Sequence, residues 1–505
     1  MLTVDINRVN FEYDINAIVR AFYPGEQVVV LTPETGIDKR NKAAEGDLIR
    51  ICIREETAEY EYGQAPGAGI IWHENHKEWT YDPGEGKFKD CFKRFLYRFL
   101  REVTGRELPW GNLTGIRPTK IAYGMLENGC TEQEILDFYR KEHYVSLEKA
   151  TLAIDIAKRE RELLKDVHYE GGYSLYIGIP FCPTTCLYCS FTSYPIAAHR
   201  KMVDRYIDCV IKELVYTAEN FKDKILDSVY VGGGTPTTLE PEQLDRLLSE
   251  VKRLFDFTHI KEFTVEAGRA DSITREKLEV IKKYGVSRIS VNPQTMNQRT
   301  LDIIGRKASV EQVREAYKIA REIGFDNINM DLILGLPGET EEDVRYTLDE
   351  VVKMAPDSLT VHSLAIKRAS KLSKWIQENG VSALRNTDET MDIASDGARR
   401  LGLVPYYLYR QKNMSGNFEN VGYAREGKLG LYNILIMEEM QTIIAVGAGS
   451  ITKKVSTVKD ENGKESVLIE RCENVKEVAM YVDKIDEMIR RKDDLFHGKK
   501  ITENR

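Results

Sequence analysis

Three cysteines, Cys182, Cys186 and Cys189, stand on one short segment in the spacing Cys-x-x-x-Cys-x-x-Cys. Clustered thiolates bind a soft metal ion or an iron–sulfur cluster. A [4Fe–4S] cluster normally takes four cysteines, so three would leave one iron without a protein ligand. Structural zinc usually takes four ligands in paired spacing, and no second pair lies nearby. We predict a [4Fe–4S] cluster with a vacant iron; a zinc site or unligated thiols are the alternatives.

The elements that position this loop follow a repeated pattern of a short apolar strand, a loop rich in Gly or Pro, and an amphipathic helix. The predicted strands are 173–179, 228–234, 262–267, 287–292, 328–334 and 358–365. The predicted helices lie near 200–222, 241–256, 273–284, 309–323 and 341–354, with apolar residues at i, i+3 and i+4. This alternation predicts an α/β fold with a parallel sheet, either doubly wound or rolled into a partial barrel. Function is expected at the carboxyl ends of its strands.

Several strand ends carry residues suited to a ligand site. Gly232-Gly-Gly-Thr-Pro236 follows the second strand, and its missing side chains would let backbone N–H groups approach a ligand. Glu266 ends the third strand, Gln294 follows the fourth, and Asp331 lies within the fifth. A charge inside an apolar strand is costly unless it is paired, so Glu266 and Asp331 are expected to have polar partners or a ligand. Arg306 is a possible counter-ion or, alternatively, a surface arginine at a helix end.

The regions before and after the repeated pattern differ from it in their predicted secondary structure. Residues 1–165 combine strand-like segments at 27–31 and 47–53 with charged helices near 86–103 and 146–166, which predicts an N-terminal α+β domain. The Gly/Pro-rich segment 108–118 is interpreted as a structured connector. We predict three domains: 1–165, a core at 170–400, and a C-terminal domain at 401–505 that covers the substrate side and closes with a helix at 476–491.

The aromatic segment 404–414 has two interpretations. Its aromatic residues stand beside Arg410, Gln411 and Lys412, an arrangement that would suit an anionic planar substrate. The alternative is a cross-strand aromatic ladder with solvated charges.

Composition narrows the functional class. The chain has 505 residues, 42% hydrophobic and 30% charged, which is typical of a globular protein with a sizeable core. Its net charge of −8 argues against a nucleic-acid-binding protein. Neither a signal peptide nor an 18-residue apolar run is visible, so we expect a cytoplasmic protein without a membrane span. The remaining cysteines are scattered and are interpreted as small apolar side chains: Cys52, Cys91, Cys130, Cys209 and Cys472.

The cysteine motif, with the aromatic Tyr188 just before its last cysteine, resembles the radical S-adenosylmethionine (radical SAM) enzymes. The resemblance implies a partial (β/α)6 barrel, a [4Fe–4S] cluster at Cys182, Cys186 and Cys189, and SAM bound to the open iron. In that family an electron from the cluster cleaves SAM to methionine and a 5′-deoxyadenosyl radical, which abstracts hydrogen from carbon. A low-potential electron donor of the flavodoxin or ferredoxin type is implied as a partner.

Within the superfamily, the chain is similar to the oxygen-independent coproporphyrinogen III dehydrogenases. The similarity rests on Tyr176 with Pro180-Phe-Cys182, on Gly232 through Thr237, and on Asp331 through Gly338. It implies catalytic roles for Tyr176 and Glu266 and a place beside SAM for Tyr188. It further implies contacts to SAM, or for Ile451 to a second SAM, from Tyr176, Gly233, Gly234, Thr235, Glu266, Gln294, Arg306, Asp331, Ala365 and Ile451.

Two positions depart from the dehydrogenase pattern, which has histidine where this chain has Gly178 and a further cysteine where it has Phe191. The segment 108–118, Tyr409 through Met414, and Gly422-Tyr423 resemble the HemZ branch of the family.

The resemblance implies oxidative decarboxylation of coproporphyrinogen III, a tetrapyrrole, to protoporphyrinogen IX in haem biosynthesis. The alternatives are a haem-binding chaperone of the same family and a radical SAM enzyme that opens the ring of another tetrapyrrole.

Overall fold

The computed structural model comprises two compact units, each described by itself. The first holds Met1–Lys158, Gly380–Ser382 and Leu408–Glu419, and the second holds Arg159–Asn379, Ala383–Tyr407 and Asn420–Arg505. The structure describes residues 2–498 except 24–25, 37–45, 55–56, 66–70, 73–76, 116, 192, 367–369, 381–383, 412–417, 460–462 and 464. No helix in the described part of the chain is both long and apolar enough to cross a membrane.

The first unit is built on a six-stranded sheet of order β2-β1-β3-β4-β5, with β6 paired to β4. Its strands are β1 (Leu2–Ile6), β2 (Val28–Leu31), β3 (Gly46–Ile53), β4 (Thr57–Ala65), β5 (Ile71–Trp72) and β6 (Lys77–Thr80). Its helices are α1 (Glu12–Phe22), α3 (Phe88–Thr104), α4 (Thr119–Glu127), α5 (Glu132–His143) and most of α6 (Leu147–Leu164). The predicted α+β class of this region is confirmed.

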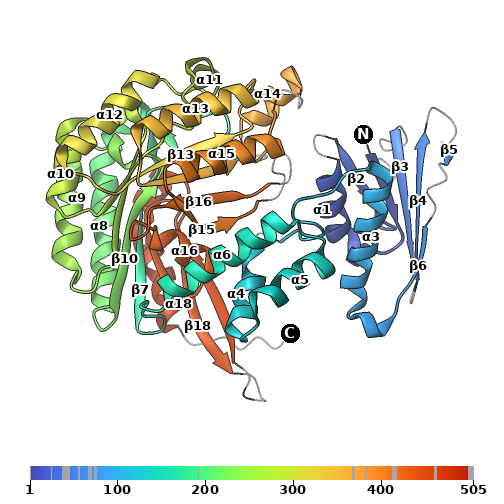
Figure 1. The fold of residues 1–505 in the computed structure, drawn as a ribbon. Helices are drawn as coiled ribbons and strands as arrows, with labels where there is room; N and C mark the ends of the chain where they lie inside the picture. The colour runs from blue at the N-terminus through green and yellow to red at the C-terminus, as the bar shows by residue number, and fades with distance from the viewer. Residues whose placement is uncertain are drawn as a thin grey trace. The chain divides into compact units, whose positions relative to one another are not determined.

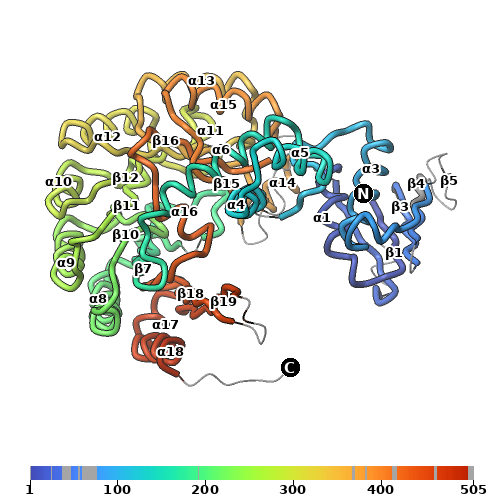
Figure 2. Tube along the Cα trace, turned by 60° about the horizontal axis from the view of Figure 1, so that its bottom comes forward, coloured from blue at the N-terminus to red at the C-terminus, as the bar shows by residue number. Residues whose placement is uncertain are grey.

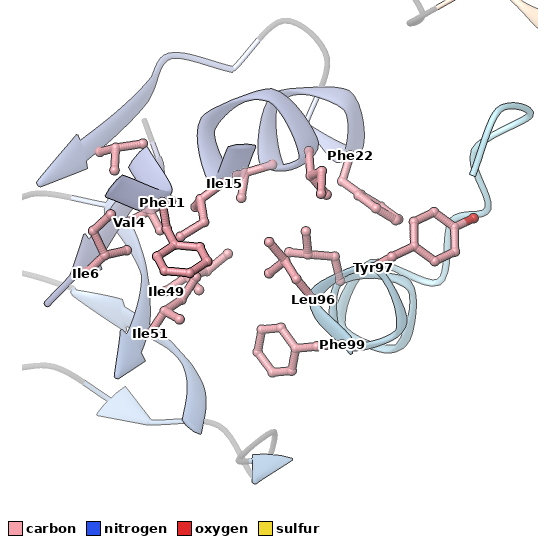
Figure 3. Close-up of a cluster of buried hydrophobic side chains, with 14 of the residues drawn as sticks. Val4, Ile6, Phe11, Ile15, Phe22, Ile49, Ile51, Leu96, Tyr97 and Phe99 are labelled. Atoms are coloured by element: carbon pink, nitrogen blue, oxygen red, sulfur yellow. The ribbon is translucent and has the colours of Figure 1, made fainter. Parts of the chain in front are cut away.

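Alternating apolar residues on β1 and β3 face the apolar sides of α1 and α3, and together they form the core of the first unit. Figure 3 shows Val4, Ile15 and Leu96 among these side chains, all of them fully buried. Strand β1 was not predicted from the sequence, although it lies between β2 and β3 in the sheet. It is short and polar at every second residue, so only its pairing with neighbouring strands distinguishes it from a loop.

The second unit contains an eleven-stranded sheet of order β15-β16-β14-β13-β12-β11-β10-β7-β17-β18-β19 (Figure 1). Six consecutive parallel strands form its centre: β7 (Gly172–Ile179), β10 (Ile225–Gly233), β11 (Glu262–Gly268), β12 (Arg288–Val291), β13 (Ile328–Leu334) and β14 (Ser358–Ser363). These are the six predicted strands, and the predicted α/β class with a parallel core is confirmed.

Five amphipathic helices follow these strands and cover their outer face, as Figure 2 shows. They are α8 (Val203–Asn220), α9 (Pro241–Leu254), α10 (Arg275–Lys283), α12 (Val310–Ile323) and α13 (Glu341–Met354). Three of them begin with capping residues whose side chains accept a backbone N–H: Thr274, Ser309 and Thr340. Sequence periodicity located all five to within a few residues.

Further elements extend this unit beyond the predicted repeat. They are α11 (Gln298–Ile303), α14 (Leu372–Asn379), α15 (Asp388–Arg400), most of β15 (Val404–Tyr409), β16 (Asn420–Ala424), α16 (Leu431–Glu438), β17 (Ile443–Val446), β18 (Ile451–Lys459), β19 (Glu465–Glu473), α17 (Val478–Asp483) and α18 (Ile485–His497). Strand β17 joins the parallel core beside β7, whereas β16 pairs antiparallel with β14. The division into three domains stays a prediction.

Candidate active site

The inner face of the parallel core carries polar side chains. Side chains alternate between the two faces of a strand, and residues paired across strands share a face. Tyr176 pairs with Tyr230, which pairs with Thr264, and Glu266 follows Thr264 on the same face. The intervening residues, such as Ile177 and Val265, are fully buried on the outer face. The sheet thus separates an apolar face under the helices from a polar face that bears the candidate residues.

Two glycines clear space on this face. Gly178 and Gly232 stand side by side in the paired strands β7 and β10. A Cβ on Gly232 would lie 2.7 Å from Tyr230 Cε1 and 2.9 Å from Glu266 Cδ, so a side chain there would have to displace Tyr230 or Glu266. Glycine at 232 therefore lets Tyr230 and Glu266 occupy the same face.

The glycine-rich turn after β10 lies against the segment that leads into the cysteine loop. Gly234 N donates to Ile179 O at 2.8 Å, and Thr235 N donates to Phe181 O at 2.7 Å. A Cβ on Gly234 would lie 2.5 Å from Phe181 O, which explains the glycine at that position. The Thr235 hydroxyl lies 3.4 Å from Cys182 Sγ. The turn therefore contacts the first cysteine of the motif directly.

Glu266 has the polar partner that the sequence predicted. Tyr230 OH donates to its carboxylate. Burial, together with the nearby Asp331 carboxylate, raises the pKa of Glu266 to about 7, although the Tyr230 hydrogen bond opposes that rise. The carboxyl is therefore close to half protonated at neutral pH, where it can hold or release a proton.

Three tyrosines stack beside this carboxyl. The ring centroids of Tyr230 and Tyr432 are 4.4 Å apart, and those of Tyr176 and Tyr230 are 6.2 Å apart, with nearly parallel planes in both pairs. Burial raises the pKa of all three phenols, so they stay protonated donors at neutral pH. Tyr230 and Tyr432 were not among the predicted site residues. The alternation of side chains along β10 could have indicated Tyr230, because it places this residue on the same face of the strand as Gly232.

Asp331 also has partners. Its Oδ1 accepts from Asn329 Nδ2 at 2.7 Å, and its Oδ2 lies 3.9 Å from His362 Nε2. Burial acts to raise the pKa of Asp331, but hydrogen bonds and the charge of His362 outweigh it and keep the pKa below its ordinary value. Asp331 is therefore an anion at neutral pH. The sequence reasoning missed His362, because a histidine within an apolar strand has no local mark of its function.

Gln294 stands next to this strand in an unusual backbone conformation. Its φ is +69°, which is uncommon for a residue other than glycine. Its N–H donates to Asp331 O at 2.9 Å, and its carbonyl accepts from Ile333 N at 3.0 Å. Its side chain is 7% exposed, and Oε1 has no hydrogen-bond partner among the described residues. A buried acceptor on a strained residue is suited to a bound ligand.

The cysteine loop is partly buried and lies beside Arg306. Cys182 and Cys186 are buried and Cys189 is half-buried. The Arg306 guanidinium donates to Asn292 O and lies next to Tyr188 and Cys186. Burial acts to lower the pKa of this arginine, but the interactions with Tyr188 and Cys186 outweigh it and raise the pKa. Its Nε has no hydrogen-bond partner within the described residues. Arg306 is thus a buried cation beside the thiols and not a surface residue.

These residues suit a cubane cluster and SAM. Each thiolate of such a cluster binds a different iron, so the sulfurs need not converge on one ion. No group of three or more His, Cys, Asp or Glu side chains among the described residues could hold a single metal ion. Cys182, Cys186 and Cys189 could hold such a cluster, and Gln294 Oε1 and Arg306 Nε are an acceptor and a donor that no other described residue satisfies.

The other predicted positions are distributed around this region. Tyr188 is half-buried beside Arg306, and its pKa is raised because the loss of solvent around its hydroxyl outweighs the opposing effect of the Arg306 charge. Ala365 lies just beyond the end of β14 and is half-buried, and Ile451 begins β18 and is 41% exposed. At the two departures from the dehydrogenase pattern, Gly178 O accepts from the buried Tyr206 hydroxyl, and Phe191 is 71% exposed.

Arg410 belongs to the first unit and is not solvated. It is 5% exposed, and its Nη1 donates to Leu113 O at 2.6 Å within the segment 108–118. Burial lowers the pKa of its guanidinium to about 10. The expectation that its charge would be solvated, as in the aromatic-ladder alternative, is wrong, because the side chain supports the backbone of that segment. Lys412 lies outside the described residues.

Comparisons with known proteins identify the family. Residues 176–351 match the family model of the radical SAM superfamily. The oxygen-independent coproporphyrinogen-III oxidase-like protein HemZ of Bacillus subtilis (strain 168) is 41% identical over 402 residues, which is 77% of this chain and 79% of HemZ.

Other relatives match shorter regions. The heme chaperone HemW of Bacillus subtilis (strain 168) is 36% identical over 38% of this chain and 51% of its own length. The oxygen-independent coproporphyrinogen III oxidase of Escherichia coli (strain K12) is 32% identical over 39% of this chain and 42% of its own length.

A solved structure shows the same fold. The coproporphyrinogen III oxidase HemN from Escherichia coli, described as a radical SAM enzyme, aligns with a TM-score of 0.50 and 23% identity over 65% of this chain and 73% of HemN. Together with the sequence match to HemZ, this fold shows that the chain belongs to the radical SAM superfamily and, within it, to the HemZ-like proteins of the HemN/HemW family.

Proposed function

We propose that the protein is an oxygen-independent coproporphyrinogen III dehydrogenase, which converts two propionate side chains of coproporphyrinogen III to vinyl groups and yields protoporphyrinogen IX. The observation that carries this proposal is the arrangement beside the three cysteines. The Arg306 guanidinium lies next to Cys186, and Gln294 follows two residues after Asn292, whose carbonyl accepts from Arg306. Two buried polar atoms of these residues, Gln294 Oε1 and Arg306 Nε, have no hydrogen-bond partner among the described residues. Such atoms are costly to bury unless a ligand completes them.

The cofactors follow from the family. When bound, a [4Fe–4S] cluster with SAM supplies the electron and the radical that remove a hydrogen atom from an unactivated carbon. The three cysteines would ligate the cluster. The turn of Gly233, Gly234 and Thr235 lies against the segment that leads into the cysteine loop, with the Thr235 hydroxyl 3.4 Å from Cys182 Sγ, which supports the roles beside SAM predicted for these residues.

Tyr176 and Glu266 are the proposed catalytic residues. The raised pKa of Glu266 lets this carboxyl donate a hydrogen bond when protonated or accept one when ionised. Tyr176 lies within the tyrosine stack and presents a protonated hydroxyl near the glycine-rich turn, because a Cβ on Gly233 would lie 3.2 Å from its oxygen. Both residues would orient SAM and the reacting propionate.

The overall reaction balances for each propionate. The β-carbon loses a hydrogen atom, the bond to the carboxylate breaks with loss of CO2, and one electron passes to an acceptor. One SAM is consumed per vinyl group, so two are consumed per product. A flavodoxin or ferredoxin is the proposed electron donor.

The test is anaerobic reconstitution of the full chain, followed by addition of SAM, a reductant and coproporphyrinogen III. Mass spectrometry is expected to find protoporphyrinogen IX with two equivalents of 5′-deoxyadenosine. The matched control is Cys186→Ser, which should lose both products because the cluster loses one of its ligands. Absence of protoporphyrinogen from the cluster-loaded protein would reject the proposal.

A haem chaperone is the second candidate, favoured by the sequence similarity to HemW. Stoichiometric haem binding without SAM cleavage in the same assay would select it. A methylated, opened tetrapyrrole would instead identify a ring-opening enzyme.

A further inference from the structure

Arg269, in the loop that follows β11, contacts the cysteine loop. The residue is 3% exposed. Its Nη1 donates to Thr184 O and to Thr184 Oγ1, both at 2.9 Å, and lies 3.7 Å from Cys186 Sγ. In a cluster-loaded protein this sulfur would be a thiolate ligand, so the guanidinium would lie next to the cluster.

Asp271 holds the opposite edge of the same guanidinium. Arg269 Nη2 lies 2.7 Å from Asp271 Oδ2, and Arg269 Nε donates to Asp271 Oδ1 at 3.0 Å. The side chains of Arg269 and Asp271 are 4% and 13% exposed, so solvent screens the pair weakly. This two-point pairing fixes the guanidinium plane and directs its remaining nitrogen at Thr184 and Cys186.

The loop that carries the pair is itself held in place. Ser272 Oγ donates to Arg269 O at 2.8 Å, and Thr237 Oγ1 donates to Ala267 O. Lys277 Nζ donates to the carbonyls of both Thr237 and Ser272. Arg269 therefore cannot retreat from Cys186 without disturbing several buried hydrogen bonds.

A positive charge next to a cluster sulfur changes the reduction potential of the cluster. Reduction adds one negative charge to an iron–sulfur cluster, and hydrogen bonds and charges near its sulfurs set the reduction potential. The nearby Arg269 cation stabilises the reduced form, whereas the more distant Asp271 anion opposes that effect. The two charges should thus shift the potential in opposite directions.

We propose that Arg269 and Asp271 form a positioning pair that sets the reduction potential of the cluster, with Arg269 raising it and Asp271 moderating the rise. The inference rests on the cluster assigned under the proposed function. It does not depend on the tetrapyrrole, so it can be tested without a substrate.

The experiment is a potentiometric titration of the reconstituted full chain, monitored by electron paramagnetic resonance, with iron and sulfide content measured first. Arg269→Gln is expected to lower the midpoint potential and Asp271→Asn to raise it. A tenfold change in the reduced-to-oxidised ratio at a fixed poise corresponds to about 59 mV for one electron. Arg269→Lys keeps the positive charge, so its midpoint potential should lie between those of the wild type and Arg269→Gln.

Arg321→Gln is the matched control. Arg321 pairs with Asp357 at 2.7 Å, but Asp357 N donates to Ile328 O at the start of β13, at the amino ends of the strands. The cysteine loop follows the carboxyl end of β7, so this variant should keep the wild-type potential.

Opposite shifts in the two variants support the proposal. Midpoint potentials that shift in the same direction in both variants, or that do not shift, overturn the proposal, because the loss of a purely structural contact would affect the cluster in the same way in both variants. Should Arg269→Gln fail to hold the full iron content, Arg269→Lys and Asp271→Asn decide by the same comparison. Failure of the wild type to assemble a cluster would instead reject the proposed function.

Discussion

Substitution of Glu213 should loosen the attachment of the C-terminal segment to the core. Glu213 lies on α8 and is completely buried, and it forms an ion pair with Lys492 of α18, which is 1% exposed. Its carboxylate also accepts from Asn474 Nδ2 at 2.9 Å, from Gly447 N at 2.8 Å and from Tyr481 OH. One carboxylate therefore joins α8, the turn after β17 and the closing helices.

Glu213→Gln keeps the shape of the side chain but removes its charge, so the Lys492 ammonium stays buried without its counter-ion. Breaking a buried ion pair by removing one partner costs about 3–5 kcal/mol. Since about 1.4 kcal/mol is a factor of ten, the equilibrium constant for opening of this segment should rise more than about 100-fold. Lys492→Met in the same background should recover much of that loss, because it removes the unpaired charge.

Hydrogen exchange under native conditions, read by mass spectrometry on peptides from β19 and α18, measures this opening. Lys212→Met is the matched control, because Lys212 on α8 pairs with Asp486 on α18 but both side chains are more than half exposed. An exposed pair contributes little, so protection should hardly change. If Glu213→Gln exchanged no faster than Lys212→Met, the reasoning from burial would be wrong.

Three further predictions follow from contacts of single residues. Gly232→Ala should weaken SAM binding at least tenfold in equilibrium dialysis, since its Cβ would lie 2.9 Å from Glu266 Cδ, whereas Gly124→Ala, with no atom within 4 Å, should not. Burial raises the pKa of Glu266 from 4.5 to about 7, so the folded state binds the extra proton between these values. As the pH rises through this window, the free energy of unfolding should fall by up to about 1.4 kcal/mol per pH unit, and above the window it should level off. Urea unfolding at each pH measures this dependence, and Glu266→Gln should lack it. Trp110→Phe removes a 2.7 Å indole hydrogen bond to the buried Glu419 and should cost about 1–3 kcal/mol, read as faster hydrogen exchange in residues 108–118.

Much of the core could be predicted because its signals are local. Short apolar runs between Gly- or Pro-rich loops mark all six parallel strands of the core, and a period of 3.6 residues marks the helices that follow them. Cysteine spacing and the Gly232–Pro236 turn are also local, so the cysteine loop and its glycine-rich neighbour were visible in the chain. Polar residues within apolar strands, such as Glu266, indicated that a partner was required.

Which partner each residue meets was decided only by the tertiary structure. Glu213 and Lys492 lie 279 positions apart, and neither carries a local sign that it will be buried. Tyr230, His362 and Arg269 reach the site through strand register and loop closure, which depend on packing of the whole sheet. The sequence by itself determined the strands and helices of the parallel core and the cysteine motif, since periodicity and spacing act between near neighbours. The tertiary structure decided the charge environment of that motif, because charges are matched across distant segments only after the sheet has formed.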